Sequence, residues 1–213
     1  MKKYFSKTPR FMMRFFSKYT WCFRSNEKEI FLTFDDGPTP EITQFVLSEL
    51  KKYNAKATFF CIGKNIQNYP EIFNKIISDG HSIGNHTQNH LNAWKTTTEN
   101  YIANFLECHK TITQFNKIKF KKQLFRPPYG KIKKSQAKKI LKKGYKIIMW
   151  DVLSADFDNT ISKERCLQNV LNNAKKGSII VFHDSLKASK KVKYALPTVL
   201  KTFSDKGFVF KKI

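Results

Sequence analysis

The chain has little of what marks a disulfide-bonded or membrane-spanning protein. It contains four cysteines, and no two are spaced like a zinc knuckle or a redox pair. We therefore expect free, buried thiols and a reducing compartment. Lysines and arginines interrupt every apolar run near the N-terminus that would serve as a secretory signal or a membrane helix. These absences predict a protein that is cytoplasmic or peripheral to the membrane.

Acidic residues are also scarce, with 16 Asp and Glu against 40 Lys and Arg and a net charge of +24. A charge of this sign permits contact with an anionic membrane or an acidic polymer through the basic surface. Joint enrichment in Lys, Asn, Ile and Phe is also typical of compositional drift in a low-GC genome. Arginine is rare, and proteins that read base edges rely on its bidentate contacts, so we expect no specific nucleic-acid partner.

Internal repeats and Ser/Gly/Pro-rich linkers are missing, and 213 residues suffice for one sizeable core. We expect a basic, aromatic extension over residues 1–28 and a single domain over residues 29–213, acting as a monomer. Phe11, Phe15 and Tyr19 recur at helical spacing in the extension. The extension is expected either to pack on the domain or to lie in a membrane interface.

Strand-like and helix-like segments alternate about seven times. The predicted strands cover residues 30–34, 58–62, 82–84, 124–125, 145–150, 178–182 and 208–210, and the predicted helices cover residues 41–52, 70–78, 98–115, 135–143, 163–174 and 194–203. This alternation predicts parallel strands with outer helices, in an open doubly wound sheet or a barrel. Polar candidates follow the strands, and this placement favours a barrel of about seven strands.

Two adjacent carboxylates, Asp35 and Asp36, end the first predicted strand and precede a Gly37-Pro38 turn. Neighbouring side chains of a strand point to opposite faces. One carboxylate is then available to bind a metal while the other moves a proton as a general base. The alternative role for Asp35 is that of a turn residue before Gly37.

His86 and His90 stand four residues apart, which places both imidazoles on one face of a helical turn. Such a pair alone also suits a surface or capping role. With Asp36 it makes a set of two histidines and one carboxylate, which is typical of a catalytic metal with open positions. Zinc is the first choice, and cobalt, nickel or iron would also bind this set.

Three further segments carry candidate acid–base residues. Arg126 begins a rigid Pro-rich loop, where its side chain is able to hold a carboxylate through a bidentate pair. A backbone N–H of the same loop is able to donate to a developing oxyanion. Asp156 is a candidate partner that orients a histidine, and His183 a candidate general acid for a leaving amine. The alternatives are turn chemistry, a helix cap and a hydrogen-bonded core residue, respectively.

Five segments together resemble the polysaccharide deacetylase family, the carbohydrate esterases (family 4) that share a NodB homology domain. The segments are TFDDGP from Thr33, HTQNH from His86, RPPYG from Arg126, Asp156-Phe157, and VFHD ending in His183-Asp184. The resemblance implies a distorted (β/α) barrel with its catalytic domain over residues 29–213. It also implies hydrolysis of the N-acetyl group of an N-acetylglucosamine-type sugar in a polysaccharide, with peptidoglycan as the leading candidate.

The resemblance also implies a role for each matching residue. Asp36, His86 and His90 match the family's metal ligands. Asp35 matches the catalytic base, which Arg126 tunes, and His183 matches the catalytic acid, which is paired with Asp156. The backbone of Tyr129 matches the donor to the oxyanion. Substrate contacts are expected from Pro128, Tyr129, Phe157 and Val181. Phe157 stands where the family usually has Trp, and Val181 where it usually has Leu, so the pocket wall stays apolar but changes shape.

Two other functions are compatible with these residues. The same centre would remove an acyl group from a different substrate, either an O-acetyl ester or a cytoplasmic or lipid-linked sugar precursor. A protein of a different class would bind an acidic polymer without turnover. Non-catalytic relatives usually lose a ligand or the base, and this chain retains all of them.

Overall fold

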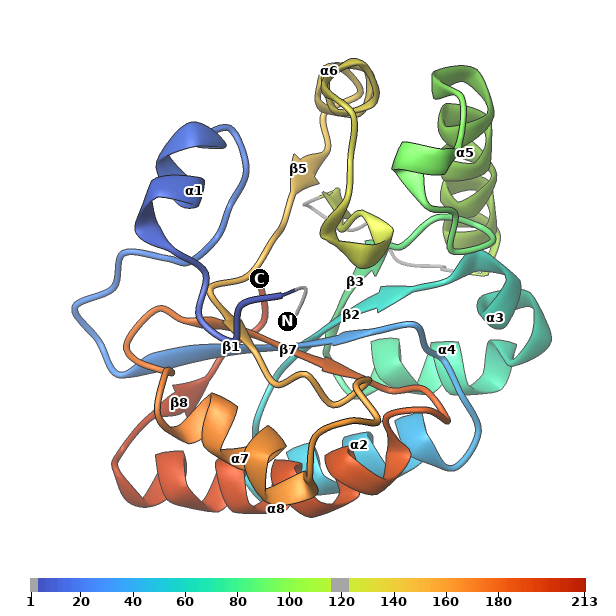
Figure 1. Ribbon diagram of the computed structural model, residues 1–213. Helices are drawn as coiled ribbons and strands as arrows, with labels where there is room; N and C mark the ends of the chain where they lie inside the picture. The colour runs from blue at the N-terminus through green and yellow to red at the C-terminus, as the bar shows by residue number, and fades with distance from the viewer. Residues whose placement is uncertain (1–3, 116–122) are drawn as a thin grey trace.

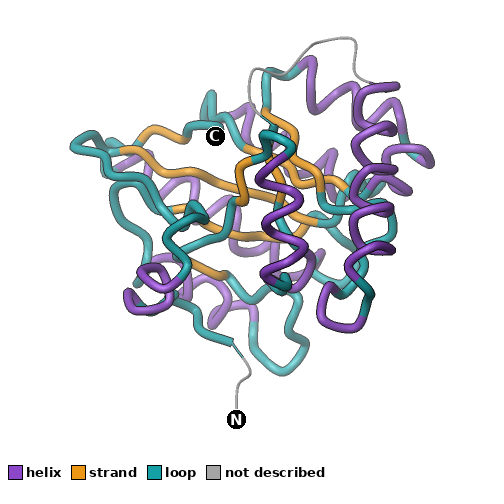
Figure 2. The backbone as a smooth tube through the Cα atoms, turned by 90° about the horizontal axis from the view of Figure 1, so that it is seen from above, coloured by secondary structure: helices purple, strands orange, loops and turns teal. Residues whose placement is uncertain are grey.

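The computed structural model describes residues 4–115 and 123–213, so residues 1–3 of the expected extension lie outside it. The strands are β1 (Glu29–Asp35), β2 (Thr58–Cys61), β3 (Ser82–Asn85), β4 (Leu124–Phe125), β5 (Lys146–Ile147), β6 (Val152–Leu153), β7 (Ile179–His183) and β8 (Val209–Phe210). They pair in parallel in the order β5-β4-β3-β2-β1-β7-β6, and β8 pairs with β1. The sheet curls into a half-barrel inside a layer of helices (Figures 1 and 2), which confirms the expected fold.

Most of the helices connect successive strands and cover the outer face of the sheet. The helices are α1 (Arg10–Phe15), α2 (Ile42–Lys52), α3 (Gly63–Asn68), α4 (Pro70–Ser78), α5 (Thr98–Phe115), α6 (Lys134–Lys142), α7 (Lys163–Leu171) and α8 (Ser189–Asp205), with short 3₁₀ turns η1 (Ala93–Lys95) and η2 (Pro128–Gly130). By contrast, α1 precedes β1, and β5 and β6 are joined without a helix. In Figure 1, α2, α7 and α8 lie together beneath β1 and β7. None of the described helices combines the length and apolar character needed to cross a bilayer.

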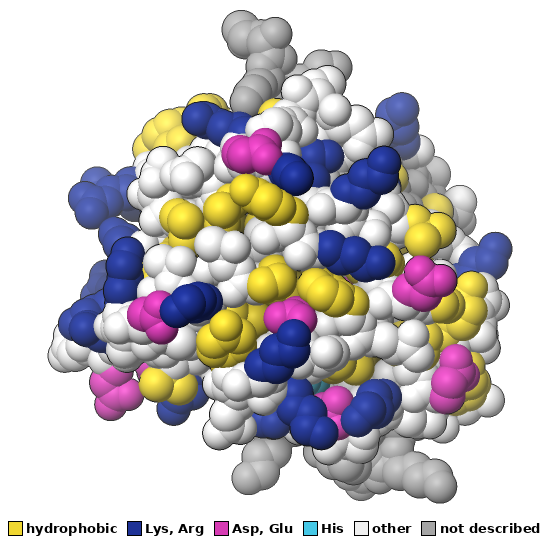
Figure 3. Space-filling view, turned by 90° about the horizontal axis from the view of Figure 1, so that it is seen from below, with side chains coloured by type: hydrophobic (Ala, Val, Ile, Leu, Met, Phe, Trp, Pro, Cys, Tyr) yellow, Lys and Arg dark blue, Asp and Glu magenta, His cyan; other side chains and the backbone are white. Residues whose placement is uncertain are grey.

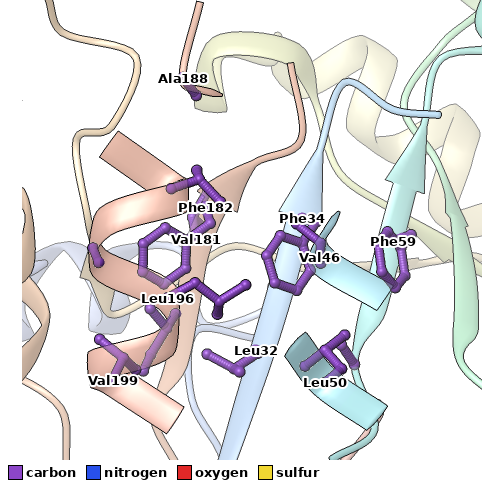
Figure 4. Packing of buried hydrophobic residues seen from close by; sticks show 14 of the residues in the cluster. Leu32, Phe34, Val46, Leu50, Phe59, Val181, Phe182, Ala188, Leu196 and Val199 are labelled. Carbon is purple, nitrogen blue, oxygen red and sulfur yellow. The ribbon is translucent and has the colours of Figure 1, made fainter. Parts of the chain in front are cut away.

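The main core lies between this helical layer and the central strands. Figure 4 shows its packing, contributed by Leu32 and Phe34 of β1, Val46 and Leu50 of α2, Val181 and Phe182 of β7, and Leu196 and Val199 of α8. After its first residue β1 is buried throughout, which is why its sequence is a continuous apolar run rather than an alternating one. The central strands are therefore rigid, and the residues at their carboxyl ends are held in fixed positions.

The N-terminal segment is part of the fold and bridges the two edges of the half-barrel. At one edge, Met149 N–H donates to the carbonyl of Thr20 (2.7 Å), and Thr20 N–H donates to that of Ile147 (2.9 Å). At the other edge, Leu153 N–H donates to the carbonyl of Ser6 (2.9 Å). Residues 6–20 thus span the gap between β5 and β6, which do not pair with each other.

Some expectations about the elements are wrong. The single strand expected over 145–150 is two strands, because β5 ends at Ile147 and β6 begins at Val152 on the opposite edge of the sheet. The last helix is longer than expected and contains Pro197. All four cysteines are free, as expected, but Cys22 is exposed rather than buried.

Candidate active site

A cavity of about 350 Å³ lies at the carboxyl ends of the strands. Five of the predicted chemical groups line it: Asp35, Asp36, His86, His90 and His183. They come from β1, from the loop after β3 and from β7, which are separate in sequence and adjacent in the sheet. Loops at this end of a parallel barrel are where active sites are built. A cavity of this size is typical of small-ligand sites.

Asp36, His86 and His90 form a set that fits a divalent cation. One ligand atom from each lies within 4.8 Å of the others, and Asp36 Oδ1 is 3.3 Å from His90 Nε2 and 3.7 Å from His86 Nε2. In the described part of the chain, Asp36 Oδ1 is one of two buried side-chain polar atoms without a hydrogen-bond partner. Leaving such an atom unpaired is costly. A cation at this position would satisfy it.

His86 is held in the tautomer that metal binding requires. Its Nδ1 lies 2.8 Å from the carbonyl oxygen of Arg126, and a carbonyl only accepts, so Nδ1 carries the hydrogen. The lone pair is then on Nε2, which faces Asp36. Burial, followed by the neighbouring His90, lowers the pKa of His86 well below its usual value. Burial also lowers the pKa of His90, although Asp36 opposes this. Both imidazoles are therefore uncharged, and each is able to offer a nitrogen lone pair to a metal.

The loop that carries the two histidines is irregular, so the expected helical turn is wrong. Residues 86–90 contain no helix, and Thr87 and His90 adopt positive φ angles of 67° and 53°. The rings of His86 and His90 nevertheless lie 5.1 Å apart. Asn104 of α5 holds the loop, since its Oδ1 accepts from Gln88 N–H at 3.1 Å. Left-handed backbone at non-glycine residues is strained and persists where the surroundings enforce it.

Asp35 and Asp36 line the same cavity, contrary to the expectation that they point to opposite faces. β1 ends at Asp35, and Asp36 has a φ of 84°, so the strand alternation stops between them. This break turns the second carboxylate back toward the histidines. The two acids are thereby able to act on one substrate.

The turn after Asp36 is fixed by Asp184, which the sequence interpretation left without a role. Asp184 Oδ1 accepts from Gly37 N–H (3.0 Å), and Oδ2 accepts from the Thr43 hydroxyl (2.6 Å). A Cβ at Gly37 would lie 1.9 Å from Asp184 Oδ2, so only glycine fits there. Burial raises the pKa of Asp184 to about 7 despite these hydrogen bonds. Asp184 therefore positions the turn that presents Asp36.

Arg126 contacts Asp35 through one nitrogen, so the expected bidentate pair is wrong. Its Nη1 donates to Asp35 Oδ1 at 2.7 Å, while Nε and Nη2 donate to the carbonyls of Ile148 and Met149. Arg126 is fully buried, with its guanidinium 4.2 Å from the Phe60 ring centroid. Burial raises the pKa of Asp35, and Arg126 opposes the rise. The second oxygen of Asp35 is not engaged by Arg126.

Half-buried His183 and buried Asp156 form a pair joined by two hydrogen bonds. Asp156 Oδ1 lies 2.7 Å from His183 Nδ1, and Oδ2 accepts from the His183 backbone N–H at 2.7 Å. Burial alone lowers the pKa of His183, but Asp156, helped by Asp36 and Asp35, raises it to about 10. A carboxylate accepts from Nδ1–H, so the Nε2 proton is the one available for donation. The arrangement is that of a histidine kept in its acidic form.

An aromatic wall closes one side of the cavity. The Phe157 ring lies edge-on to His183 at 5.2 Å, and Tyr4 lies edge-on to Phe157 at 5.5 Å. The Tyr4 hydroxyl donates to Asp158. Val181 also lines the cavity. Tyr4 precedes every recognisable motif, so only the folded N-terminal segment reveals its place at the site.

The Pro-rich loop contributes to the cavity through fewer residues than expected. Tyr129 lines the cavity, with a φ of 60° and its ring 4.6 Å from that of His90. Pro128 is buried and is not among the described residues that line the cavity. Trp150 and Lys187 line it without having been predicted, since no local pattern distinguishes them.

The chain is similar to known proteins along most of its length. A family model described as polysaccharide deacetylase matches residues 24–148. Two peptidoglycan-N-acetylglucosamine deacetylases of Bacillus cereus are 35% and 36% identical over 170 and 193 residues, which is 79% and 90% of this chain. The chain spans 61% of the length of the first relative and 89% of the second.

A solved structure gives the same picture for the fold. The crystal structure of a peptidoglycan N-acetylglucosamine deacetylase in complex with 4-naphthalen-1-yl-N-oxidanyl-benzamide superposes with a TM-score of 0.87 at 31% identity. The match covers 97% of this chain and 95% of that one. The family model and the Bacillus relatives confirm the resemblance found in the sequence motifs, and the chain belongs to the polysaccharide deacetylase family.

Proposed function

We propose that the protein is a metal-dependent deacetylase that hydrolyses the N-acetyl group of N-acetylglucosamine units in peptidoglycan. One observation carries the proposal: a single cavity unites the Asp36–His86–His90 set with a buried carboxylate, Asp35, and with His183, a histidine paired with Asp156. Amide hydrolysis needs both a base and an acid beside an electrophile. Peptidoglycan is favoured because similar proteins are named for it.

Asp36, His86 and His90 are the residues that would hold the metal. When bound there, a divalent metal supplies a Lewis acid that lowers the pKa of water and polarises the acetyl carbonyl. Zinc is our choice of metal, because two neutral imidazoles and one carboxylate make a donor set found in catalytic zinc sites. Cobalt, nickel and iron bind the same donor types.

The acid–base residues divide the proton transfers between them. Asp35 takes a proton from the attacking water, and Arg126 keeps its Oδ1 oriented (2.7 Å). As the carbon–nitrogen bond breaks, His183 delivers its Nε2 proton to the leaving amine, while Asp156 retains Nδ1. The products are acetate and a free amino sugar. The proton gained by Asp35 and the one lost by His183 are then exchanged with solvent.

The remaining cavity residues account for substrate placement. Phe157, Val181 and Trp150 form an apolar surface suited to the acetyl methyl group. The backbone N–H of Tyr129 is our candidate donor to the developing oxyanion. The metal set, the base and the acid all come from one chain, which supports a monomeric enzyme.

The proposal is tested by acetate release from purified peptidoglycan and from N-acetylglucosamine oligomers. The expected result is release from peptidoglycan that stops on chelation. Faster release from the oligomers would replace peptidoglycan as the substrate, while keeping the deacetylase. No release from either substrate by metal-loaded protein would refute the proposal.

A further inference from the structure

Exposed phenylalanines are confined to one short stretch of the described chain. They are Phe5 (58% exposed), Phe11 (61%), Phe15 (84%) and Phe16 (42%). All other described phenylalanines are buried or half-buried. Single exposed apolar side chains are ordinary on a soluble protein, but a cluster of large ones marks an interaction surface.

The stretch is firmly attached to the domain, so its exposed rings are presented by folded structure. Met13 and Tyr19 pack against the core cluster that contains the buried Trp21. The Trp21 indole N–H donates to the carbonyl of Phe16 (3.1 Å), and Tyr19 N–H donates to the same carbonyl (3.0 Å). The segment is therefore anchored through Met13, Tyr19 and Trp21, while Phe11 and Phe15 of the same segment stay exposed.

The charge around these rings has one sign. The first 26 residues contain seven Lys or Arg and no Asp or Glu. On α1, Phe11 and Phe15 are four residues apart, as are Arg10 and Arg14, so each pair stacks along the helix surface. Figure 3 shows a different pattern on the face formed by the lower helices, where Lys and Arg are interspersed with Asp and Glu.

We propose that α1 and the turn after it dock on the surface of an anionic lipid bilayer. Aromatic rings beside cationic side chains are typical of segments that lie in the headgroup region, with the rings in the acyl boundary and the cations on the lipid phosphates. A water-soluble acidic polymer would pair with Arg10 and Arg14 but would leave the rings of Phe11 and Phe15 in water. A bilayer offers lipid phosphates to the arginines and an apolar boundary to the rings.

Docking would hold the cavity close to the membrane. Tyr4 lines the cavity, and only five residues separate it from Arg10 at the start of α1. That length of chain spans at most about 20 Å. A docked enzyme would therefore work on sugar polymer near the bilayer surface.

The test is co-sedimentation of the full 213-residue chain with vesicles of phosphatidylglycerol and phosphatidylcholine in equal parts, and with pure phosphatidylcholine. We expect binding to the mixed vesicles and little to the neutral ones. Phe11→Ser with Phe15→Ser should weaken binding by at least about tenfold. Arg10→Gln with Arg14→Gln should weaken it about 30-fold at low ionic strength, and added salt should reproduce this loss.

Matched substitutions elsewhere control for charge and apolarity. Lys142→Gln with Lys143→Gln removes two exposed cations at the end of α6, and Val209→Ser removes an exposed apolar side chain on β8. Both should bind vesicles as the unaltered chain does. Circular dichroism would verify that every variant is folded. None of the substituted residues lines the cavity, so the result does not depend on deacetylase activity.

Three results would overturn the proposal. The first is no binding of the unaltered chain to the mixed vesicles. The second is equal binding of all variants. The third is that the chain binds polyglutamate as strongly as it binds vesicles, and that this binding is lost in the arginine variant but unchanged in the Phe11 and Phe15 variant. An acidic polymer would then be the partner instead.

Discussion

Replacing Asp156 by Asn tests the acid–base division most sharply. The substitution keeps the shape of the side chain and removes the charge that holds the His183 proton. Asp156 accepts from both the Nδ1–H and the backbone N–H of His183, at 2.7 Å each. An amide offers one acceptor and one donor, so only one of these hydrogen bonds survives.

The expected shift follows from the pKa of His183, which is about 10 against an ordinary value of 6.5. Burial lowers this pKa, so without the carboxylate it should fall to the ordinary value or below. At pH 8 the protonated fraction would drop from nearly all to about 3%, and kcat should fall about 30-fold. Near pH 6 much of the activity should return. A cation bound at Asp36 would offset the charge of that carboxylate. The pKa of His183 in the unaltered protein would then be lower than about 10, but the Asn substitution would still lower it.

The assay is the pH profile of kcat for acetate release, whose basic limb should move down by about three units in the Asn variant. Asp151→Asn is the control, because Asp151 is equally buried and accepts from Ile179 N–H (2.9 Å) without contacting His183. Asp151→Asn should lower the free energy of unfolding and leave the basic limb of the pH profile in place. An unmoved limb in Asp156→Asn would refute the assignment of His183 as the acid.

The same pair predicts how stability varies with pH. The pKa of His183 is higher in the folded than in the unfolded protein, so the pair with Asp156 stabilises fully below about pH 6.5. That contribution is lost as the pH rises through about 10. The difference in free energy of unfolding between the original protein and Asp156→Asn should shrink over this range in urea titrations.

Three other substitutions give separate tests. Asp36→Asn should abolish the metal-induced rise in melting temperature without lowering that of the metal-free protein, since Oδ1 has no partner to lose; a lower metal-free melting temperature would contradict this. Tyr4→Ala should raise KM severalfold with kcat nearly unchanged. Phe5→Ala, at the neighbouring exposed position, should alter neither constant. Equal effects of the two substitutions on KM would show that Tyr4 is not part of the aromatic wall of the cavity. Gly37→Ala should cost about 1–3 kcal/mol by overpacking against Asp184, as measured by urea unfolding, and unchanged stability would show that the turn is free to move.

Much of the site was predictable because its residues follow strands. Asp35, His86 and His183 each end or follow a strand, and parallel strands bring their carboxyl ends to one side of the sheet. The order of chemical groups along the chain was therefore enough to place them together. The sheet itself was also predictable, because its buried central strands are unbroken apolar runs.

The backbone at the site was not predictable from local pattern. The expected alternation failed at Asp36 and the expected helical turn failed at His90, because both residues adopt positive φ angles. Long-range contacts impose those angles, through Asp184 on the Gly37 turn and through Asn104 on the histidine loop. Such contacts join residues far apart in sequence, so no window of neighbouring residues records them.

The central claim is that the Asp36–His86–His90 cavity is a metal-dependent hydrolytic centre. The most direct test titrates zinc into chelated protein while bound metal and acetate release from peptidoglycan are measured on the same samples. The account predicts that release returns in step with metal bound at one ion per chain and is absent in Asp36→Asn. Acetate release that persists in the metal-free protein would contradict it.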